Sequence, residues 1–268
     1  MWSPADNQGK AYSWGRNECG QLGLGDMVNR NDPTELTQLS ALGKVVAASC
    51  GRFHSVVVLE NGDAYTCGSN KHGQCGTGEC KSSPQREECH VHWVKALVEG
   101  VADAKCGAEF TLWRTREGRV FSAGLPQYGQ LGHGTDEEYN AAEFSIKLTY
   151  PPQPTPRAIE GVLADRKIVN IACGHNHSIA VDDEGVCYTW GTGGYGRLGH
   201  KVQKDEMAPR PIEAFLRGAH SGAKDSLLAC SSTCTLVTTG ARSQGCRRGA
   251  TMPLAHRSTT RAIRVLPC

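Results

Sequence analysis

One glycine-rich motif recurs four times along the 268-residue sequence. The copies begin at Gly9, Gly62, Gly118 and Gly185, and their aligned glycines Gly15, Gly68, Gly124 and Gly191 stand 53, 56 and 67 residues apart. Self-similarity at such a period is typical of architectures in which each repeat is one supersecondary unit that cannot bury its apolar faces alone. The repeat therefore limits the fold to a stack of similar units.

A second motif keeps step with the first. It consists of Cys-Gly, then His or Phe three residues after the glycine, then Ser or Thr. It occurs at residues 50–55, 106–111 and 173–178, with a worn copy at 229–235. Because two separate motifs agree in their spacing, we interpret the repeat as an architectural unit rather than a chance similarity.

Each repeat has the pattern of short β-strands joined by tight turns. In the best-defined copy, strands are predicted at residues 44–50, 54–59 and 63–67, and a further strand near 35–39. The dipeptide Asn61-Gly62 between the last two strands favours a two-residue hairpin turn. No repeat shows a long helical period. Units of three or four strands at this spacing are typical of β-propeller blades, which cover their faces by stacking around an axis.

The two motifs resemble the repeat of the regulator of chromosome condensation family. Residues 14–25 match its Trp-Gly-x-Asn-x-x-Gly-Gln-Leu-Gly-x-Gly motif, and residues 50–55 and 173–178 match its Cys-Gly-x-x-His-Ser/Thr motif. The Trp-Asp dipeptide of WD repeats and the regular double glycine of kelch blades are missing. The resemblance covers residues 9–240 and implies an all-β, seven-bladed propeller, of which about four blades are present as an incomplete ring.

Within that family, residues 106–110, 190–200 and 203–210 are similar to the telophase-disk subfamily. This resemblance implies a protein-interaction scaffold that regulates a small GTPase or binds chromatin, microtubule or other cytoskeletal partners in cell division. Guanine nucleotide exchange by such a scaffold would require no catalytic acid, base, metal or cofactor from this chain. One alternative is a truncated, non-functional or dominant-negative partial product. Another is a plant-type light sensor, which would need Gly-Trp-Arg-His-Thr where this chain has Gly51-Arg-Phe-His-Ser.

Charge is nearly balanced over the whole chain but not along it. The net charge of +2, from 29 basic and 27 acidic residues, argues against nonspecific binding of the whole chain to nucleic acid. Residues 241–268, however, hold six arginines and no acidic residue. We divide the chain into a partial propeller at 1–240 and a degenerate Arg-rich tail at 241–268. The tail is either a worn fifth blade or an artefact, and we expect nucleic-acid contact only there.

The sequence also bears on location and self-association. The first 30 residues lack the apolar core of a signal peptide, and no apolar run is long enough to span a membrane. Thirteen cysteines, an odd number, favour reduced thiols. We therefore expect no membrane contact and a nuclear or cytoplasmic location in a reducing compartment. An incomplete ring leaves open blade edges, through which copies could self-associate.

The repeated positions are predicted to be structural, because a catalytic residue is usually single whereas a structural one recurs with the architecture. They are Trp14, Gly15, Gly20, Gly23, Gly51, His54, Gly68, Gly107, Gly124, Gly174, His177, Trp190 and Gly191. His54 and His177 are expected as buried imidazoles that bond to the backbone inside their own blades. Cys50, Cys106 and Cys173 are expected as small buried residues.

One local cluster has the chemistry of metal ligands. It comprises Cys75, Cys80, Cys89, His90 and His92. Thiolate and imidazole are zinc donors, but no Cys-x-x-Cys pair occurs and Cys75 replaces a core leucine of the motif. We therefore assign neither a metal site nor a cofactor. The sequence also lacks a nucleophile elbow, a phosphate loop and a His-Glu-x-x-His motif, so no catalytic residue is assigned.

The longest repeat carries an insertion between Gly134 and Arg157. It holds Asp136, Glu137, Glu138 and Tyr139, followed by four prolines. Prolines favour extended chain, and loops on a rigid scaffold often carry function. We therefore expect an exposed loop here that contacts a specific partner; the alternative is a solvated linker.

Overall fold

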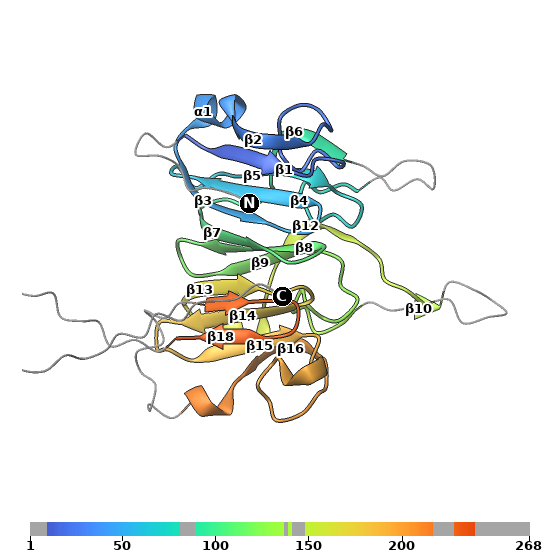
Figure 1. The fold of residues 1–268 in the computed structure, drawn as a ribbon. Coiled ribbons are helices and arrows are strands. Elements are labelled where there is room, and N and C mark those ends of the chain that lie inside the picture. The colour runs from blue at the N-terminus through green and yellow to red at the C-terminus, as the bar shows by residue number, and fades with distance from the viewer. Residues whose placement is uncertain (1–9, 81–88, 137–138, 141–147, 217–227, 239–268) are drawn as a thin grey trace, which may run out of the picture.

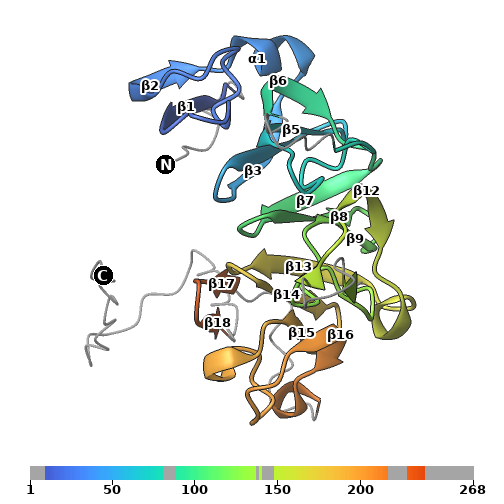
Figure 2. The same cartoon turned by 90° about the vertical axis from the view of Figure 1, so that its right-hand side faces the viewer.

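The computed structural model describes residues 10–80, 89–136, 139–140, 148–216 and 228–238. Over these residues the chain is built mainly from antiparallel sheets. Figure 1 shows the sheets stacked one upon another, and Figure 2, turned by 90°, shows that they follow an open arc.

Three sheets have four strands each and form complete blades. Blade 2 consists of β3 (Val45–Cys50), β4 (His54–Leu59), β5 (Ala64–Ser69) and β6 (Cys89–Lys95). Blade 3 consists of β7 (Val101–Cys106), β8 (Phe110–Thr115), β9 (Val120–Gly124) and β12 (Gln153–Ala158). Blade 4 consists of β13 (Ile168–Cys173), β14 (His177–Asp182), β15 (Cys187–Gly191) and β16 (Glu206–Pro211).

Each end of the arc carries a two-stranded sheet. Half-blade 1 pairs β1 (Tyr12–Gly15) with β2 (Arg30–Glu35), and half-blade 5 pairs β17 (Leu228–Cys230) with β18 (Thr235–Val237). The worn second motif is thus folded as a strand pair. The predicted all-β fold, an incomplete propeller ring, is confirmed over the described residues.

The remaining elements are short. The insertion forms a hairpin of β10 (Tyr139–Asn140) and β11 (Leu148–Thr149). Helix α1 spans Thr37–Leu42, and single-turn 3-10 helices span Gly161–Leu163 (η1), Gly194–Gly196 (η2) and Glu213–Phe215 (η3). All of these lie in connections between strands of the blades or between blades.

The first strands of successive sheets lie next to one another. Strand β3 contacts β7, β7 contacts β13, and β13 contacts β17. These strands therefore line the axis of the arc, and the fourth strands β2, β6, β12 and β16 lie at its outer rim.

The hydrophobic core lies between blades rather than within one sheet. The junction of blades 3 and 4 is filled by a cluster that includes Phe110, Leu112, Ile168, Ile171 and Trp190, each at most 1% exposed. Equivalent clusters fill the junctions before and after it. Because each apolar face is covered by the neighbouring sheet, every blade depends on its neighbours for burial.

The outer strand of half-blade 1 differs from the sequence prediction. A strand is predicted near residues 35–39, but β2 ends at Glu35 and helix α1 follows. Leu39, the last residue of the predicted strand, is buried on this helix instead. A short apolar segment suits either structure, and here the helix covers the outer part of the junction.

The proline-rich part of the insertion also differs from the prediction. Pro154 and Pro156 lie within β12, which pairs with β9, rather than in an extended loop. Strand β12 is the rim strand of blade 3, and proline is tolerated there because an edge strand leaves N–H positions unpaired.

The glycine of the second motif packs directly against an aromatic ring. A Cβ atom at Gly174 would lie 2.0 Å from the His177 ring and 2.5 Å from the Ser231 carbonyl oxygen of half-blade 5. A Cβ atom at Gly51 would lie 2.3 Å from the His54 ring, and one at Gly107 would lie 1.8 Å from the Phe110 ring. The motif needs glycine because each turn touches both its own ring and the next blade.

We predict that Gly174→Ala destabilises the chain by about 1–3 kcal/mol, because the added methyl group must displace the His177 ring or the next blade. The measurement is the free energy of unfolding in urea. Gly194→Ala in the same blade is the control, since its Cβ would have no neighbour closer than 3.6 Å. Its effect should stay within about 0.5 kcal/mol. Equal effects of the two variants would contradict the packing argument.

Candidate interaction face

One end of every blade carries two of its connecting segments. In blade 2, His54 pairs with Gly68, so the β3–β4 turn lies beside the end of β5, and the Ser69 N–H donates to the Phe53 carbonyl. Blades 3 and 4 repeat this arrangement. The turns between first and second strands, with the segments that follow β1, β5, β9 and β15, therefore form one surface. We call it the loop face.

A hydroxyl group crosses every junction beneath the loop face. The Ser or Thr of the second motif, which follows His54, Phe110, His177 or, in the worn copy, Cys234, donates to a backbone carbonyl of the preceding blade. The bonds run from Ser55 to Gln21, Thr111 to Gln74, Ser178 to Gln130 and Thr235 to Arg197, at 2.7–3.0 Å. The two motifs of the sequence thus meet across each junction.

Two imidazoles extend this contact. The Nε2 atom of His54 lies 2.9 Å from Thr111 Oγ1, and that of His177 lies 2.9 Å from Thr235 Oγ1. Because each hydroxyl donates its proton to a carbonyl, each ring donates from Nε2. Burial lowers the pKa of both imidazoles from 6.5 to about 4, so the rings are neutral near pH 7.

This finding corrects the sequence expectation for the two histidines. Their rings are buried, but their partner is a hydroxyl of the next blade and not a backbone group of their own blade. Blade 3 has Phe110 at the same place; its ring is fully buried, and Ser178 of blade 4 still donates to Gln130. An apolar ring therefore also fits this position.

The other repeat positions lie where strands meet loops. Six of the predicted glycines have positive φ angles, namely Gly15, Gly20, Gly23, Gly68, Gly124 and Gly191. Trp190 is fully buried, and its Nε1 donates to the Gln130 carbonyl at 2.9 Å. Trp14 holds the equivalent place in half-blade 1 but is only partly buried.

The cysteines of the second motif lie at the axis. Cys50, Cys106, Cys173 and Cys230 line an open cavity of about 350 Å³. Cys106 is buried and Cys173 half-buried, but Cys50 is exposed, which corrects the expectation that all three are buried. Among the described strands, none precedes β3 at the axis and covers Cys50. Burial raises the pKa of the Cys106 and Cys173 thiols, which keeps them protonated.

Arginine and aromatic side chains gather on the loop face at the junction of half-blade 1 and blade 2. The guanidinium groups of Arg16 and Arg52 lie 5.4 and 5.0 Å from the ring centroid of Phe53. Both arginines are exposed, and Arg16 also pairs with Glu18. We call Arg16, Arg52 and Phe53 the cationic–aromatic cluster. Such residues are common among the energetically dominant residues of protein interfaces.

The next junction carries an ion pair on the same face. His72, which follows β5, places Nε2 3.2 Å from Glu109 Oε2 in the β7–β8 turn. The hydrogen bond from His72 holds the pKa of Glu109 below its usual value. Glu109 therefore remains a carboxylate through the neutral range and presents negative charge beside the cluster.

At the far junction, Tyr195 differs from the repeat in its exposure, since Tyr128 at the equivalent position of blade 3 is half-buried. Tyr195 is 81% exposed, with a φ of +59°. In the other repeats, the side chains of Gln21, Gln74 and Gln130 accept an N–H from the residue two positions earlier. Arg197 replaces this glutamine, donates to the carbonyls of Gly194 and Ser232, and lies 5.6 Å from the Tyr195 ring. The sequence shows the exchange of glutamine for arginine but not its effect on Tyr195.

The predicted partner loop lies only partly within the described residues. Asp136 is half-buried, Tyr139 opens β10, and Glu137 and Glu138 fall outside the description. The β10–β11 hairpin leaves blade 3 through the segment after β9, on the side of the loop face, and extends away from the blades in Figure 1. The Arg-rich tail at 241–268 also lies outside the described residues.

The cysteine and histidine cluster of blade 2 is not assembled as a ligand set. Cys75 is fully buried, and its thiol lies 3.5 Å from the Ser69 carbonyl oxygen. His92 is exposed on β6. Among the described residues, no three His, Cys, Asp or Glu side chains stand close enough to share a metal ion.

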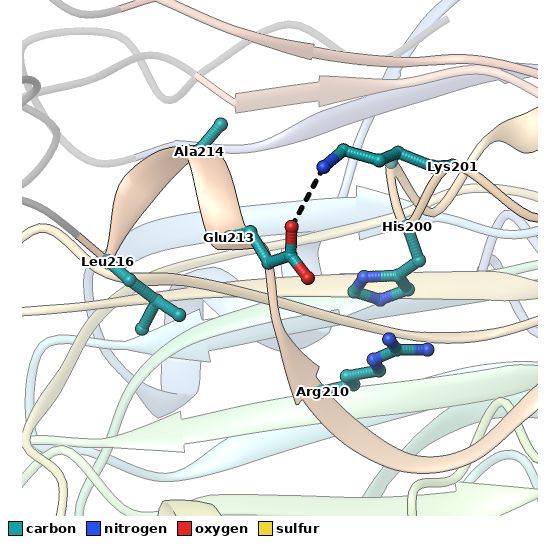
Figure 3. Close-up of a pocket in the computed structure, with 7 residues that line it drawn as sticks. His200, Lys201, Arg210, Glu213, Ala214 and Leu216 are labelled. Carbon is teal, nitrogen blue, oxygen red and sulfur yellow. Dashed lines mark hydrogen bonds and ion pairs between the residues drawn. The ribbon is translucent and has the colours of Figure 1, made fainter.

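A pocket of about 610 Å³ lies on the outer side of blade 4, away from the axis (Figure 3). Its wall includes His200, Lys201 and Arg210. Lys201 pairs with Glu213 at 2.9 Å, and Arg210 pairs with Glu206 at 2.6 Å. Each of these two basic groups is thus balanced by a carboxylate.

Comparison with known proteins gives the same architecture. Residues 5–237 match the model of the RCC1-like domain. The chain is 39% identical to the RCC2 homolog of Xenopus laevis over 220 residues, which cover 78% of this chain and 41% of that protein. It thus spans less than half of that relative's length.

Solved structures show a similar fold. The chain resembles human WBSCR16 at 21% identity with a TM-score of 0.68, covering 88% of this chain and 55% of that one. It also resembles Prp20p of Saccharomyces cerevisiae at 21% identity with a TM-score of 0.66, covering 87% and 52%.

In the part of the chain that is described, no helix is long and apolar enough to cross a membrane.

The buried imidazoles predict a pH dependence of stability. Between pH 6.5 and about 4, the unfolded chain binds protons that the folded chain excludes, so the free energy of unfolding falls as the pH falls through this window. His54→Phe, which copies blade 3, should reduce the loss between pH 7 and pH 5 by about 2 kcal/mol. Urea unfolding at both pH values measures this. The control is His175→Gln, an exposed ring on the same face; an unchanged slope in His54→Phe would refute the assignment.

Proposed function

Since this chain belongs to the family of RCC1-like domains, we propose that it is a protein-interaction scaffold that binds its partner through the loop face. The partner classes are a small GTPase and a chromatin or cytoskeletal protein. No cofactor and no catalytic side chain of this chain is part of the proposal.

The observation that carries this proposal is the cationic–aromatic cluster on the loop face. Arg16, Arg52 and Phe53 come from two successive sheets and are held together by ring contacts. The sheets form a rigid base, and loops on such a base are the usual place for binding residues. The ion pair of His72 and Glu109 and the exposed Tyr195 continue the same surface along the arc.

Regulation of a GTPase by such a surface requires only a difference in affinity. A scaffold that binds the nucleotide-free GTPase more tightly than the nucleotide-bound form shifts the equilibrium toward nucleotide release. The shift cannot exceed that difference in affinity. Exchange activity is therefore compatible with a loop face that carries charge and aromatic rings but performs no proton transfer.

One structural neighbour supports a GTPase and chromatin as partner classes without assigning a partner. Prp20p has binding properties to Gsp1p and histones, and we extend only the classes, a GTPase and chromatin, to this chain. We place this activity in the nucleus or the cytoplasm. Within the chain, we propose residues 1–240 as the propeller part and 241–268 as a separate tail, the one part proposed to contact nucleic acid.

We also keep the insertion as a partner-specific contact. Asp136, Glu137, Glu138 and Tyr139 precede or open the β10–β11 hairpin, which extends away from blade 3. Its acidic residues would add a negative element to a face that is basic at the other end of the arc. A partner that carries a basic patch and an acidic patch at the matching spacing would contact both.

We predict that Arg52→Glu and Phe53→Ala each weaken partner binding about tenfold or more, because they remove the centre of the cluster. The probes are core histones and a small GTPase in its nucleotide-free and nucleotide-bound forms, with binding measured by calorimetry. If exchange is the activity, the nucleotide-free form binds more tightly.

Arg119→Glu is the matched control. Arg119 also stacks over a phenylalanine, at 5.3 Å from the Phe121 ring centroid, but it lies at the β8–β9 turn, at the opposite end of blade 3. It should leave binding unchanged. Equal losses in Arg52→Glu and Arg119→Glu would remove the loop face from the proposal, and no binding to either class of probe would reject the function itself.

A further inference from the structure

The two half-blades are complementary parts of one blade. Strand β1 carries the Trp-Gly motif, which marks the third strand of complete blades, and β2 is its fourth strand. Strands β17 and β18 carry the worn second motif, which marks the first and second strands. Among the described strands, β1 pairs with β2 alone and β18 with β17 alone. Half-blade 1 is therefore the outer half of a blade, and half-blade 5 is the inner half.

Residues at the two open edges are more exposed than their equivalents in complete blades. Leu236 of β18 is 54% exposed, whereas Val56, Leu112 and Ile179 at the same position are fully buried. Trp14 of β1 is partly buried, whereas Trp190 at its position is fully buried. Both half-blades thus present apolar surface that a complete blade removes from water.

Each half-blade already has the internal geometry of its counterpart. Ser13 of β1 donates to the Leu22 carbonyl at 2.9 Å, as Ser122 donates to Leu131 in blade 3. Half-blade 5 is docked on blade 4 by the bond from Thr235 to the Arg197 carbonyl. Little rearrangement is therefore needed for either half to accept the other.

The register of such a composite blade follows from the complete ones. In all three, the His or Phe of the second strand pairs with the glycine of the third: His54 with Gly68, Phe110 with Gly124, and His177 with Gly191. The same rule places Cys234 opposite Gly15, Thr235 opposite Trp14, and Leu236 opposite Ser13. Leu236 would then lie between the composite blade and blade 2 of the second copy, as Leu112 lies between blades 3 and 4.

The two edges cannot meet within one copy of the arc shown. Figure 2 places β1 and β17–β18 at opposite ends of the open arc, with the complete blades between them. We propose that β18 of one copy pairs antiparallel with β1 of a second copy, and reciprocally. A head-to-tail contact of this kind forms a closed ring if the rotation closes. Two copies would give a ring of about eight blades, which is within the range of propellers.

The first test is the mass of the full 268-residue chain in solution, by light scattering coupled to size exclusion. We expect a dimer. Leu236→Arg should give a folded monomer. The arginine side chain stays in water at the exposed position that Leu236 has in one copy, but it cannot be buried in the composite blade. Val162→Arg is the matched control: Val162 is a 51% exposed apolar residue in η1, between blades 3 and 4 and away from both ends of the arc, so its variant should remain a dimer. A monomeric parent chain, or equal behaviour of both variants, would overturn the proposal.

A mixing experiment separates strand pairing from general stickiness. Trp14→Arg blocks the β1 edge, at a position that holds Cys67 in blade 2 and Ala123 in blade 3, so it does not need an aromatic residue to fold. Alone, Trp14→Arg and Leu236→Arg should each be monomeric. Mixed, they should form a heterodimer, because the first keeps an intact β18 and the second an intact β1. Two folded variants that stay monomeric in the mixture would refute the pairing.

Discussion

Each of the four junctions between the described blades is aligned by the same hydrogen bond, from a hydroxyl of one blade to a backbone carbonyl of the blade before it. Ser55, Thr111, Ser178 and Thr235 make this bond in turn. The acceptor is the Gln of the first motif or the Arg197 that replaces it, and the donor is the Ser or Thr of the second motif. The two motifs recur in step because each unit must present both sides of the same contact. Burial between the sheets then supplies most of the stabilisation.

The inner strands could be predicted from the sequence, and the rim strands could not. Strands β4 and β14 are buried along their whole length and read as apolar runs. Strand β2 has the sequence Arg-Asn-Asp-Pro-Thr-Glu and β12 the sequence Gln-Pro-Thr-Pro-Arg-Ala. These strands contain no buried residue and are held along one edge by backbone bonds, so no apolar alternation marks them. The partners of His54 and His177 lie 57 and 58 residues away, which no local pattern reveals.

Positions that follow the repeat and positions that depart from it differ in what they can do. Repeated residues such as Gly51 and Thr111 are enclosed between blades. Phe53, Tyr195 and Arg197 are not constrained in this way, and they stand on the loop face, where a partner can reach them. The repeat could be read as architecture from one sequence, whereas the departures acquire meaning only when the fold shows which of them share a surface. The outer pocket of blade 4 is a further example. Lys201 and Glu213 stand twelve residues apart in the sequence, and only the fold shows that they pair in the pocket wall.

Prolines in the rim strands have a consequence for how copies of this chain can assemble. Pro33 lies in β2, Pro154 and Pro156 in β12, and Pro209 and Pro211 in β16. A proline offers no N–H, so these edges present an interrupted row of donors and are poor templates for another strand. Strand pairing between copies at the outer rim is thereby disfavoured. Among the described rim strands, β6 alone contains no proline. The two ends of the arc carry no such interruption, because β1 and β18 contain no proline, so strand pairing between copies is favoured there rather than at the rim.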